Sequence, residues 1–379
     1  MDFRFSEEQQ QFAESLRRWV EKNYAFEQRK RIVESAQGVS DAAWQGLAEL
    51  GATALLVPEE QGGLNGSPVD LMVVMKELGR GLVVEPFFAT ALGAEFLKQT
   101  GGHDILEQVA AGGVKLACAL NERDAAHDLF DVAVTARREG DDYVLNGEKT
   151  VVIHGAQADA LIVSARTGGA QRDHDGISLF IVPAATGGMR IREYRTYDGQ
   201  RGADVSFSDM RLPASALLGA EGEGWPVIEA VADYGIALLC SEAVGLMENV
   251  NAATLEYLKT REQFGVPIGT FQVLQHRMAD MYMHQEQARA ITTLAVAKLG
   301  KVDAEERRRF ISAAKVRVGQ AAKFIGQQTV QMHGGMGMTN ELPAAHCFKR
   351  LTAIDTTLGD IDYHLARFIA RPQFMEVAA

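Results

Sequence analysis

The chain has 379 residues, and its 38 basic against 50 acidic side chains give a formal net charge of −12. That length predicts two or three domains, and 47% hydrophobic with 23% charged residues is typical of a folded globular protein. The acidic balance argues against nucleic acid binding, which depends on Lys and Arg neutralising phosphates. No apolar run approaches the roughly 18 residues of a membrane span. The first residues also lack the apolar core of a signal peptide, so we expect a cytoplasmic protein that does not contact a membrane.

Residues 1–117 are expected to form an α-helical domain. Ser6 and Gln9 have the spacing of a capping box, and apolar residues follow at helical intervals. Ser67 and Pro68 predict the start of another helix, because a capping residue precedes a proline at the first helical position.

Residues 118–220 have the period of strands. A strand, a turn and a strand are predicted between Val132 and Leu145, where Gly140 follows a charged residue at the turn. Further strands are predicted at Leu161–Ala165, Ile177–Val182 and Asp204–Ser208. No long helical pattern separates these strands, so we predict an antiparallel β-domain and not a parallel βαβ sheet.

Residues 221–379 return to helical spacing. Four apolar stripes, which contain Leu239, Leu274, Phe310 and Leu365, predict a four-helix bundle. The predicted fold class is therefore α+β and mostly α, with an N-terminal helical domain (1–117), a middle antiparallel β-domain (118–220) and a C-terminal four-helix bundle (221–379).

Two motifs in the bundle have the chemistry of a phosphate site. Arg261-Glu262-Gln263-Phe264-Gly265 offers a guanidinium fork, and Gln331-Met332-His333-Gly334-Gly335-Met336-Gly337 offers backbone that a ligand can approach closely. Helix-forming sequence lies between them, so both motifs are expected at helix ends. We interpret His333 as a structural or interface residue and not as an acid–base group.

The order of these motifs resembles the acyl-CoA dehydrogenase family. Its R-x-Q-F-G and Q-x-x-G-G-x-G patterns match the two bundle motifs, its P-E-x-x-G-G matches Pro58–Gly63, and its β-domain matches Leu145–Lys149. The most similar type is the small (β) subunit of bacterial heteromeric enzymes, including the pimeloyl-CoA dehydrogenase type. The resemblance implies α,β-desaturation of an acyl-CoA thioester, with FAD as the hydride acceptor and electron-transfer flavoprotein as the next acceptor.

The resemblance also implies which residues contact FAD. The family's bundle motifs reach across a subunit interface to the neighbouring subunit's cofactor. Carried onto this chain, the cofactor-binding residues are Arg261, Gln263, Phe264, Gln272, Gln331, Gly334 and Gly335. The implied partners are a related large subunit, in an α₂β₂ assembly, or a second copy of the chain in a homodimer. The three cysteines have no metal-ligand spacing, so no metal site is expected.

The chain departs from the family at the catalytic base. The two positions where relatives carry the glutamate fall on Leu358 and Gly235, and neither residue can accept a proton. Asp360 is the nearby carboxylate, but its place before a helical pattern indicates a helix cap. The catalytic residue is therefore left unknown, with Asp360 as a weak candidate.

Two motifs that the family places beside the flavin ring are also altered. The loop T-E-P-x-x-G-S-D corresponds to Asn121–Asp128, and the strand K-x-W-I-T corresponds to Lys149–Ile153. The final threonine, whose hydroxyl lies near the flavin N5 atom in the family, is Ile153.

Three functions remain open from the sequence. The first is a subunit that completes its partner's FAD site and lacks a base of its own. The second is a self-sufficient homo-oligomeric dehydrogenase with Asp360 or Asp233 as an atypical base. The third is a non-catalytic acyl-CoA-binding or structural paralogue, against which the retained Arg261, Gln263 and Gln331 argue.

Overall fold

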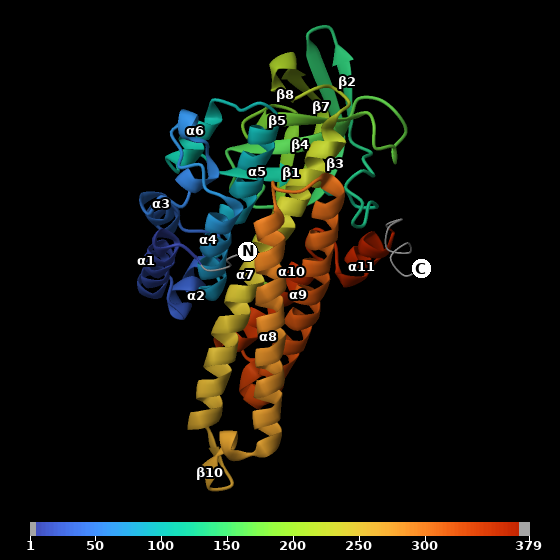
Figure 1. Cartoon of the computed structure of the whole chain (residues 1–379). Coiled ribbons are helices and arrows are strands. Elements are labelled where there is room, and N and C mark those ends of the chain that lie inside the picture. The colour runs from blue at the N-terminus through green and yellow to red at the C-terminus, as the bar shows by residue number, and fades with distance from the viewer. Residues whose placement is uncertain (1–4, 371–379) are drawn as a thin grey trace. The chain divides into compact units, whose positions relative to one another are not determined.

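The computed structural model describes residues 5–370, so the first four residues, which bear on the expected lack of a signal peptide, lie outside it. The chain folds into helices and one large β-sheet (Figure 1). Two compact units contain these elements. One runs to Lys30, resumes over Pro68–Val83 and continues from Ile236, and the other comprises Arg31–Ser67 and Val84–Gly235. The predicted fold class is confirmed, whereas the boundaries at 117/118 and 220/221 stay predictions.

The N-terminal part is helical, as predicted. Its α-helices are α1 (Glu7–Asn23), α2 (Phe26–Glu34), α3 (Asp41–Glu49), α4 (Pro68–Arg80), α5 (Phe87–Gln99) and α6 (Ile105–Ala110). The capping box is present, because the Gln9 backbone N–H donates to Ser6 Oγ at 3.2 Å and the Ser6 N–H donates to Gln9 Oε1 at 3.0 Å. Helix α4 begins at Pro68, where the sequence predicted it.

The β-domain is one sheet with the strand order β6-β7-β3-β2-β4-β5-β8. Its strands are β1 (Leu116–Ala119), β2 (Thr135–Glu139), β3 (Asp142–Ile153), β4 (Ala160–Arg166), β5 (Ile177–Pro183), β6 (Met189–Arg195), β7 (Arg201–Pro213) and β8 (Leu217–Leu218). Neighbours along this order are antiparallel except β2 and β4, and β1 adds a parallel pairing to β4. Strands β1, β6 and the two-residue β8 were not predicted from the sequence. Strand β6 carries exposed charges on both faces, so it lacks the alternation that marks a half-buried strand.

The C-terminal part is a helical bundle. Its helices are α7 (Gly224–Thr260), α8 (Gln272–Lys298), α9 (Ala304–His333), α10 (Pro343–Thr356) and α11 (Ile361–Ile369). The fourth long helix was assigned wrongly. The stripe at Leu365 belongs to the nine-residue helix α11, and the fourth long helix is α10, which begins at Pro343 and packs on α9.

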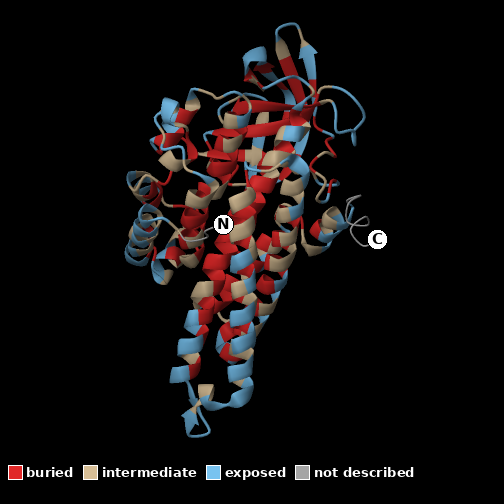
Figure 2. Ribbon diagram, in the orientation of Figure 1, coloured by how far each residue is buried: buried red, intermediate tan, exposed pale blue. Residues whose placement is uncertain are grey.

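Helix α7 is long and apolar enough to cross a membrane by length and composition alone. However, 89% of its most apolar window is buried inside the protein, as in the core helix of a globular fold. In Figure 2, buried residues lie along the helices of the bundle, and exposed residues lie at the α7–α8 connection. The apolar character of α7 is therefore explained by packing.

Helices α4 and α7 approach each other closely at two glycines. A Cβ atom on Gly79 would lie 2.2 Å from the Glu242 carbonyl oxygen, and one on Gly245 would lie 1.9 Å from the Lys76 carbonyl oxygen. Both clashes are with backbone, which cannot rotate away as a side chain can. The contact thus depends on the missing side chains at both positions.

Candidate cofactor site and catalytic position

The first motif forms a tight hairpin at the end of α7. Arg261 follows the last residue of the helix, and strands β9 (Glu262–Gln263) and β10 (Val266–Pro267) pair antiparallel. Between them, Phe264 and Gly265 have φ values of 57° and 80°. Positive φ at both central residues is the requirement of the tight turn that best fits a two-residue hairpin.

The second motif lies at the end of α9, as expected. Gly334 ends the helix with φ 58°, and residues Gly334–Met338 continue as a 3₁₀ turn. A Cβ atom added to Gly334 or to Gly335 would meet no atom within 4 Å. The backbone of both glycines is therefore open to a group that approaches from outside.

The structure brings the two motifs together through an aromatic pair. The rings of Tyr257, one turn before Arg261, and His333, the last residue of α9, stack with centroids 4.4 Å apart. His333 is 6% exposed, and its Nδ1 lies 2.9 Å from the Thr329 carbonyl oxygen. This burial and stacking confirm that His333 is structural.

The polar side chains of this site are exposed and poorly engaged within the chain. Among residues 5–370, the side chains of Arg261, Gln272 and Gln331 form no hydrogen bond or ion pair, and Gln263 donates only to the adjacent Glu262 carbonyl. A guanidinium, several amides and two open glycines form a donor set that suits the pyrophosphate of a dinucleotide. The residues present therefore fit the pyrophosphate of an FAD whose opposite side is held by another subunit.

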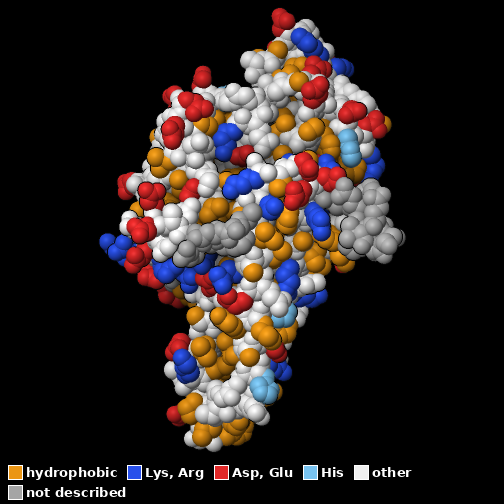
Figure 3. All heavy atoms as spheres, in the orientation of Figure 1, with side chains coloured by type: hydrophobic (Ala, Val, Ile, Leu, Met, Phe, Trp, Pro, Cys, Tyr) orange, Lys and Arg blue, Asp and Glu red, His pale blue; other side chains and the backbone are white. Residues whose placement is uncertain are grey.

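Exposed apolar side chains surround these donors. In Figure 3, hydrophobic atoms gather at the lower end of the bundle, where the α7–α8 hairpin lies. The large ones in this region are Phe264 (91% exposed), Val266 (38%), Phe271 (37%), Val273 (60%), Met336 (45%) and Met338 (76%). A concentration of this kind marks an interaction surface more often than a free one.

Neither position of the expected base carries a carboxylate. Leu358 lies in the turn between α10 and α11, with φ 55°, and its carbonyl oxygen accepts from His364 Nε2 at 2.8 Å. Gly235 is buried within α7. Asp360 caps α11, where it accepts the Tyr363 N–H at 2.9 Å, so the predicted capping role is confirmed. Asp233 is fully buried in α7.

A buried lysine that the sequence analysis missed supports the turn at Leu358. Lys315 of α9 is fully buried, and its Nζ donates to the carbonyl oxygens of Ile354 and Thr357 at the end of α10. Burial lowers the pKa of Lys315 to about 8. The signal was present in the sequence, because this lysine falls on the apolar face between Ala314 and Val318.

A buried ion pair joins the loop Asn121–Asp128 to the strand Lys149–Ile153. Lys149 Nζ donates to Glu122 Oε1 at 2.7 Å and to Ser164 Oγ at 2.9 Å, and Lys149 is fully buried. Burial lowers the pKa of Lys149 to about 8, although Glu122 opposes the shift. Both residues occupy the charged positions of their motifs. The loop Asn121–Asp128 and the strand Lys149–Ile153 are thus held together by a buried ion pair.

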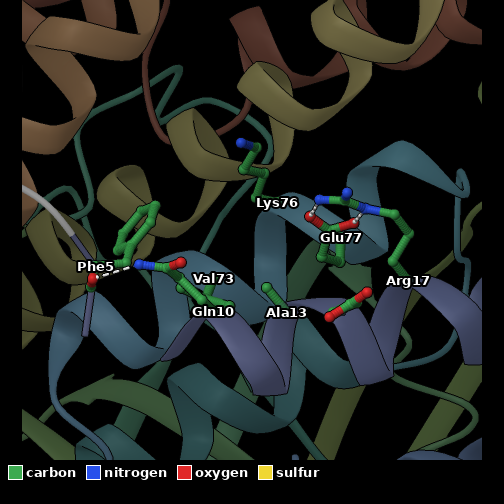
Figure 4. A pocket seen from close by; sticks show the side chains of 8 residues that line it. Phe5, Gln10, Ala13, Arg17, Val73, Lys76 and Glu77 are labelled. Carbon is green, nitrogen blue, oxygen red and sulfur yellow. Dashed lines mark hydrogen bonds and ion pairs between the residues drawn. The ribbon is translucent and has the colours of Figure 1, made fainter. Parts of the chain in front are cut away.

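A hollow in the described part of the chain lies away from these motifs. Figure 4 shows it between α1 and α4, with a volume of about 320 Å³. Its walls include Phe5, Val73 and Glu77, and the Glu77 carboxylate is held by Arg17 at 2.8 Å. None of the predicted site residues lines it.

Comparison with known proteins gives the class. Three family models match the chain: the N-terminal domain of acyl-CoA dehydrogenase over residues 6–111, the middle domain over 117–212 and the C-terminal domain over 222–372. The human mitochondrial short-chain specific acyl-CoA dehydrogenase is 32% identical over 320 residues, which are 80% of this chain and 76% of that protein.

Solved structures agree with these matches. Butyryl-CoA dehydrogenase from Megasphaera elsdenii superposes with a TM-score of 0.89 at 26% identity, covering 98% of this chain and 99% of that one. A chain of the ChsE4-ChsE5 complex from Mycobacterium tuberculosis has a TM-score of 0.88 at 23% identity, covering 100% and 99%, and bears on the fold alone.

The chain belongs to the acyl-CoA dehydrogenase family. This family binds FAD, and the chain is accordingly an FAD-dependent acyl-CoA dehydrogenase by family and fold.

Proposed function

We propose that the chain is a subunit of a heteromeric acyl-CoA dehydrogenase that completes the FAD site of a neighbouring subunit and lacks a catalytic base of its own. Arg261, Gln263 and Gln331 contact the FAD pyrophosphate, and Gly334 and Gly335 let it approach the backbone. Phe264 and Gln272 complete the contact surface. The observation that carries this proposal is the set of exposed polar side chains at one end of the bundle, of which Arg261 and Gln331 form no side-chain hydrogen bond or ion pair within residues 5–370.

The absence of a base follows from the residue types at the two family positions. FAD, when bound, accepts a hydride from the β-carbon of the thioester while a carboxylate removes the α-proton. Leu358 and Gly235 cannot take that proton. Asp360 already accepts a backbone N–H as a helix cap, and Asp233 is 0% exposed. This chain's part is then to bind and orient the cofactor, which accounts for a large share of such a barrier.

The proposed assembly is an α₂β₂ complex with a related large subunit, of the type of the small subunit of pimeloyl-CoA dehydrogenase. A homodimer of the isolated chain is compatible with it. The exposed apolar side chains beside Arg261 support bundle-to-bundle contact, because an assembly would cover them. Electron-transfer flavoprotein is the proposed electron acceptor, and the cytoplasm the proposed location.

Removal of the Arg261 charge tests the cofactor assignment. The chain is co-expressed with the product of the neighbouring gene, and FAD affinity of the complex is measured by flavin fluorescence. Loss of a charge-assisted hydrogen bond costs about 1.5–3 kcal/mol, so Arg261→Ala should weaken FAD binding roughly 10- to 150-fold. Arg307→Ala, which changes an arginine at the other end of α9, is the control and should leave the affinity unchanged.

Equal FAD affinity of the parent and Arg261→Ala complexes would refute the assignment. A chain that stayed monomeric both alone and with its co-expressed neighbour would refute the subunit role. FAD binding with no measurable acyl-CoA oxidation in any complex would favour the non-catalytic paralogue.

A further inference from the structure

The two halves of the candidate cofactor site come from different helices, and the residues Tyr257 and His333 join them. Arg261 follows α7, whereas Gln331 and Gly334 belong to the end of α9, about seventy residues later in the chain. The stack of Tyr257 on His333, with centroids 4.4 Å apart and ring planes at 28°, connects these helix ends. A cofactor contacted by both motifs requires a fixed spacing between them.

Both rings are held in place by backbone contacts. The His333 Nδ1 lies 2.9 Å from the Thr329 carbonyl oxygen, which can only accept, so Nδ1 carries the proton. The Tyr257 hydroxyl donates to the His333 carbonyl oxygen at 3.4 Å. The Arg261 N–H donates to the Tyr257 carbonyl oxygen at 2.8 Å. This hydrogen bond links the position of Tyr257 to the start of the hairpin.

The flanking residues show why the stack bears on the ligand. His333 lies two residues after Gln331 and immediately before Gly334. Gln331, Gly334 and Gly335 therefore lie on the same short backbone segment as His333. A Cβ atom added to Gly334 or Gly335 would meet no atom within 4 Å, so no side chain packs on that side of either glycine. The ring and the hydroxyl of Tyr257 both contact His333, and these contacts tie the residue before the glycine turn to the end of α7.

We propose that Tyr257 and His333 are positioning residues of the cofactor site, which hold Arg261 and the Gln331–Gly335 turn at the spacing that one FAD pyrophosphate requires. The inference rests on the proposed function, because it assumes that both motifs contact FAD. Neither residue touches the cofactor in this role. Each acts by reducing the conformational freedom that binding would otherwise remove.

The bundle contains a matched aromatic pair for a control. His284 of α8 stacks on Phe324 of α9 with centroids 4.2 Å apart and planes at 11°. Phe324 lies about two helical turns before Gln331, and neither ring adjoins a candidate residue in sequence. Loss of this stack should affect stability without changing the spacing of the two motifs.

The experiment compares Tyr257→Leu, Tyr257→Phe and Phe324→Leu in the complex that the parent chain forms. Thermal unfolding without FAD and FAD affinity are both measured. Since an aromatic pair contributes about 0.5–1.5 kcal/mol, we expect Tyr257→Leu to weaken FAD binding about twofold to tenfold. Tyr257→Phe keeps the ring and loses only the hydroxyl bond to the His333 carbonyl oxygen, so it should lose less FAD affinity than Tyr257→Leu. Phe324→Leu should lower the melting temperature and leave FAD affinity unchanged.

The outcomes separate this inference from the proposed function. If Arg261→Ala weakens FAD binding but Tyr257→Leu does not, the positioning role is wrong and the cofactor assignment stands. If Arg261→Ala has no effect, the cofactor assignment is wrong. Equal losses of FAD affinity in Tyr257→Leu and Phe324→Leu would reduce the stack to a stability contact and overturn the inference. Should Tyr257→Leu fail to assemble, Tyr257→Met, which also lacks the ring, takes its place in each comparison.

Discussion

At the scale of single residues, the structure contains two fully buried ammonium groups, those of Lys149 and Lys315. Burial lowers the pKa of both Lys149 and Lys315 to about 8, because water no longer solvates their charge. Each group is surrounded by oxygen atoms. Lys149 Nζ donates to the Leu120 carbonyl oxygen as well as to Glu122 and Ser164, and so uses all three of its donors. Such groups stabilise the fold only while every partner is present.

Lys149→Met should therefore destabilise the β-domain strongly. The change leaves the buried carboxylate of Glu122 without its counter-charge, and the break of a buried pair costs about 3–5 kcal/mol. The free energy of unfolding from urea titration measures the loss. Lys259→Met removes an exposed pair with Glu256 and should change stability by less than about 1 kcal/mol. Similar stabilities for both variants would contradict the role of the buried pair.

The pH dependence of stability should reveal Lys315. Its pKa is about 8 in the folded protein against an ordinary value of 10.5, so between these values the unfolded chain holds a proton that the folded chain has released. The contribution of Lys315 to the free energy of unfolding is then smallest below pH 8 and rises with pH across the window. Urea unfolding of the parent and of Lys315→Met should show a stability difference that grows over this range. The exposed Lys301→Met serves as control, and a difference that stays flat for Lys315→Met would show that the amine titrates normally.

These residues also mark how far a sequence can predict a site. The donors Arg261 and Gln331 were recognisable, because their residue types within the two motifs already indicate a phosphate contact. Lys315 lies on an apolar helix face that the sequence shows, but it was not singled out. The pair of Lys149 with Glu122 was not recognised, because it arises from a tertiary contact. Tyr257 and His333 are more than seventy residues apart, and no local pattern predicts that their rings meet.

At the scale of elements, capping and periodicity predicted the helices better than the strands. The Ser6 cap and the Pro68 start are local signals, and the structure bears out both. Helix α10 was missed because Arg350 and other polar residues interrupt its apolar stripe. In the structure, Arg350 is paired with Glu242 of α7 at 2.6 Å, a contact that compensates its burial. A helix with buried polar pairs thus lacks the regular apolar spacing from which helices are predicted.

The contact of α4 with α7 provides a test at this scale. Gly245→Ala places a methyl group 1.9 Å from the Lys76 carbonyl oxygen, so the two helices must separate. Overpacking of this kind costs about 1–3 kcal/mol or more, and we expect a lower melting temperature for Gly245→Ala and for Gly79→Ala. Gly187→Ala, where a Cβ atom meets nothing within 4 Å, should be neutral. Unchanged stability in the two helix variants would mean that the helices do not pack as closely as described.

At the scale of the whole molecule, the two ends of the chain's candidate chemistry differ in residue type. The bundle end has an exposed arginine, exposed amides and two exposed glycines, while the two positions where the resemblance places the glutamate hold Leu358 and Gly235. The fold is shared with butyryl-CoA dehydrogenase, which superposes with a TM-score of 0.89 at 26% identity. Sequence predicted this fold from motif order, but assembly is a property of surfaces that no linear pattern describes.

The isolated chain should accordingly bind FAD weakly or substoichiometrically and show little thioester dehydrogenation. Leu358→Glu should not restore activity in the chain alone, because a base without a correctly held flavin has no hydride acceptor. In addition, Leu358 lies at φ 55°, a conformation that glutamate also adopts reluctantly. Flavin content and acyl-CoA oxidation of the purified chain, with and without its co-expressed neighbour, measure both claims. Robust turnover by the chain alone would overturn the subunit role and bring back an atypical carboxylate. Asp360→Asn and Asp233→Asn would then identify it, since only the variant that removes the base should abolish turnover while FAD stays bound.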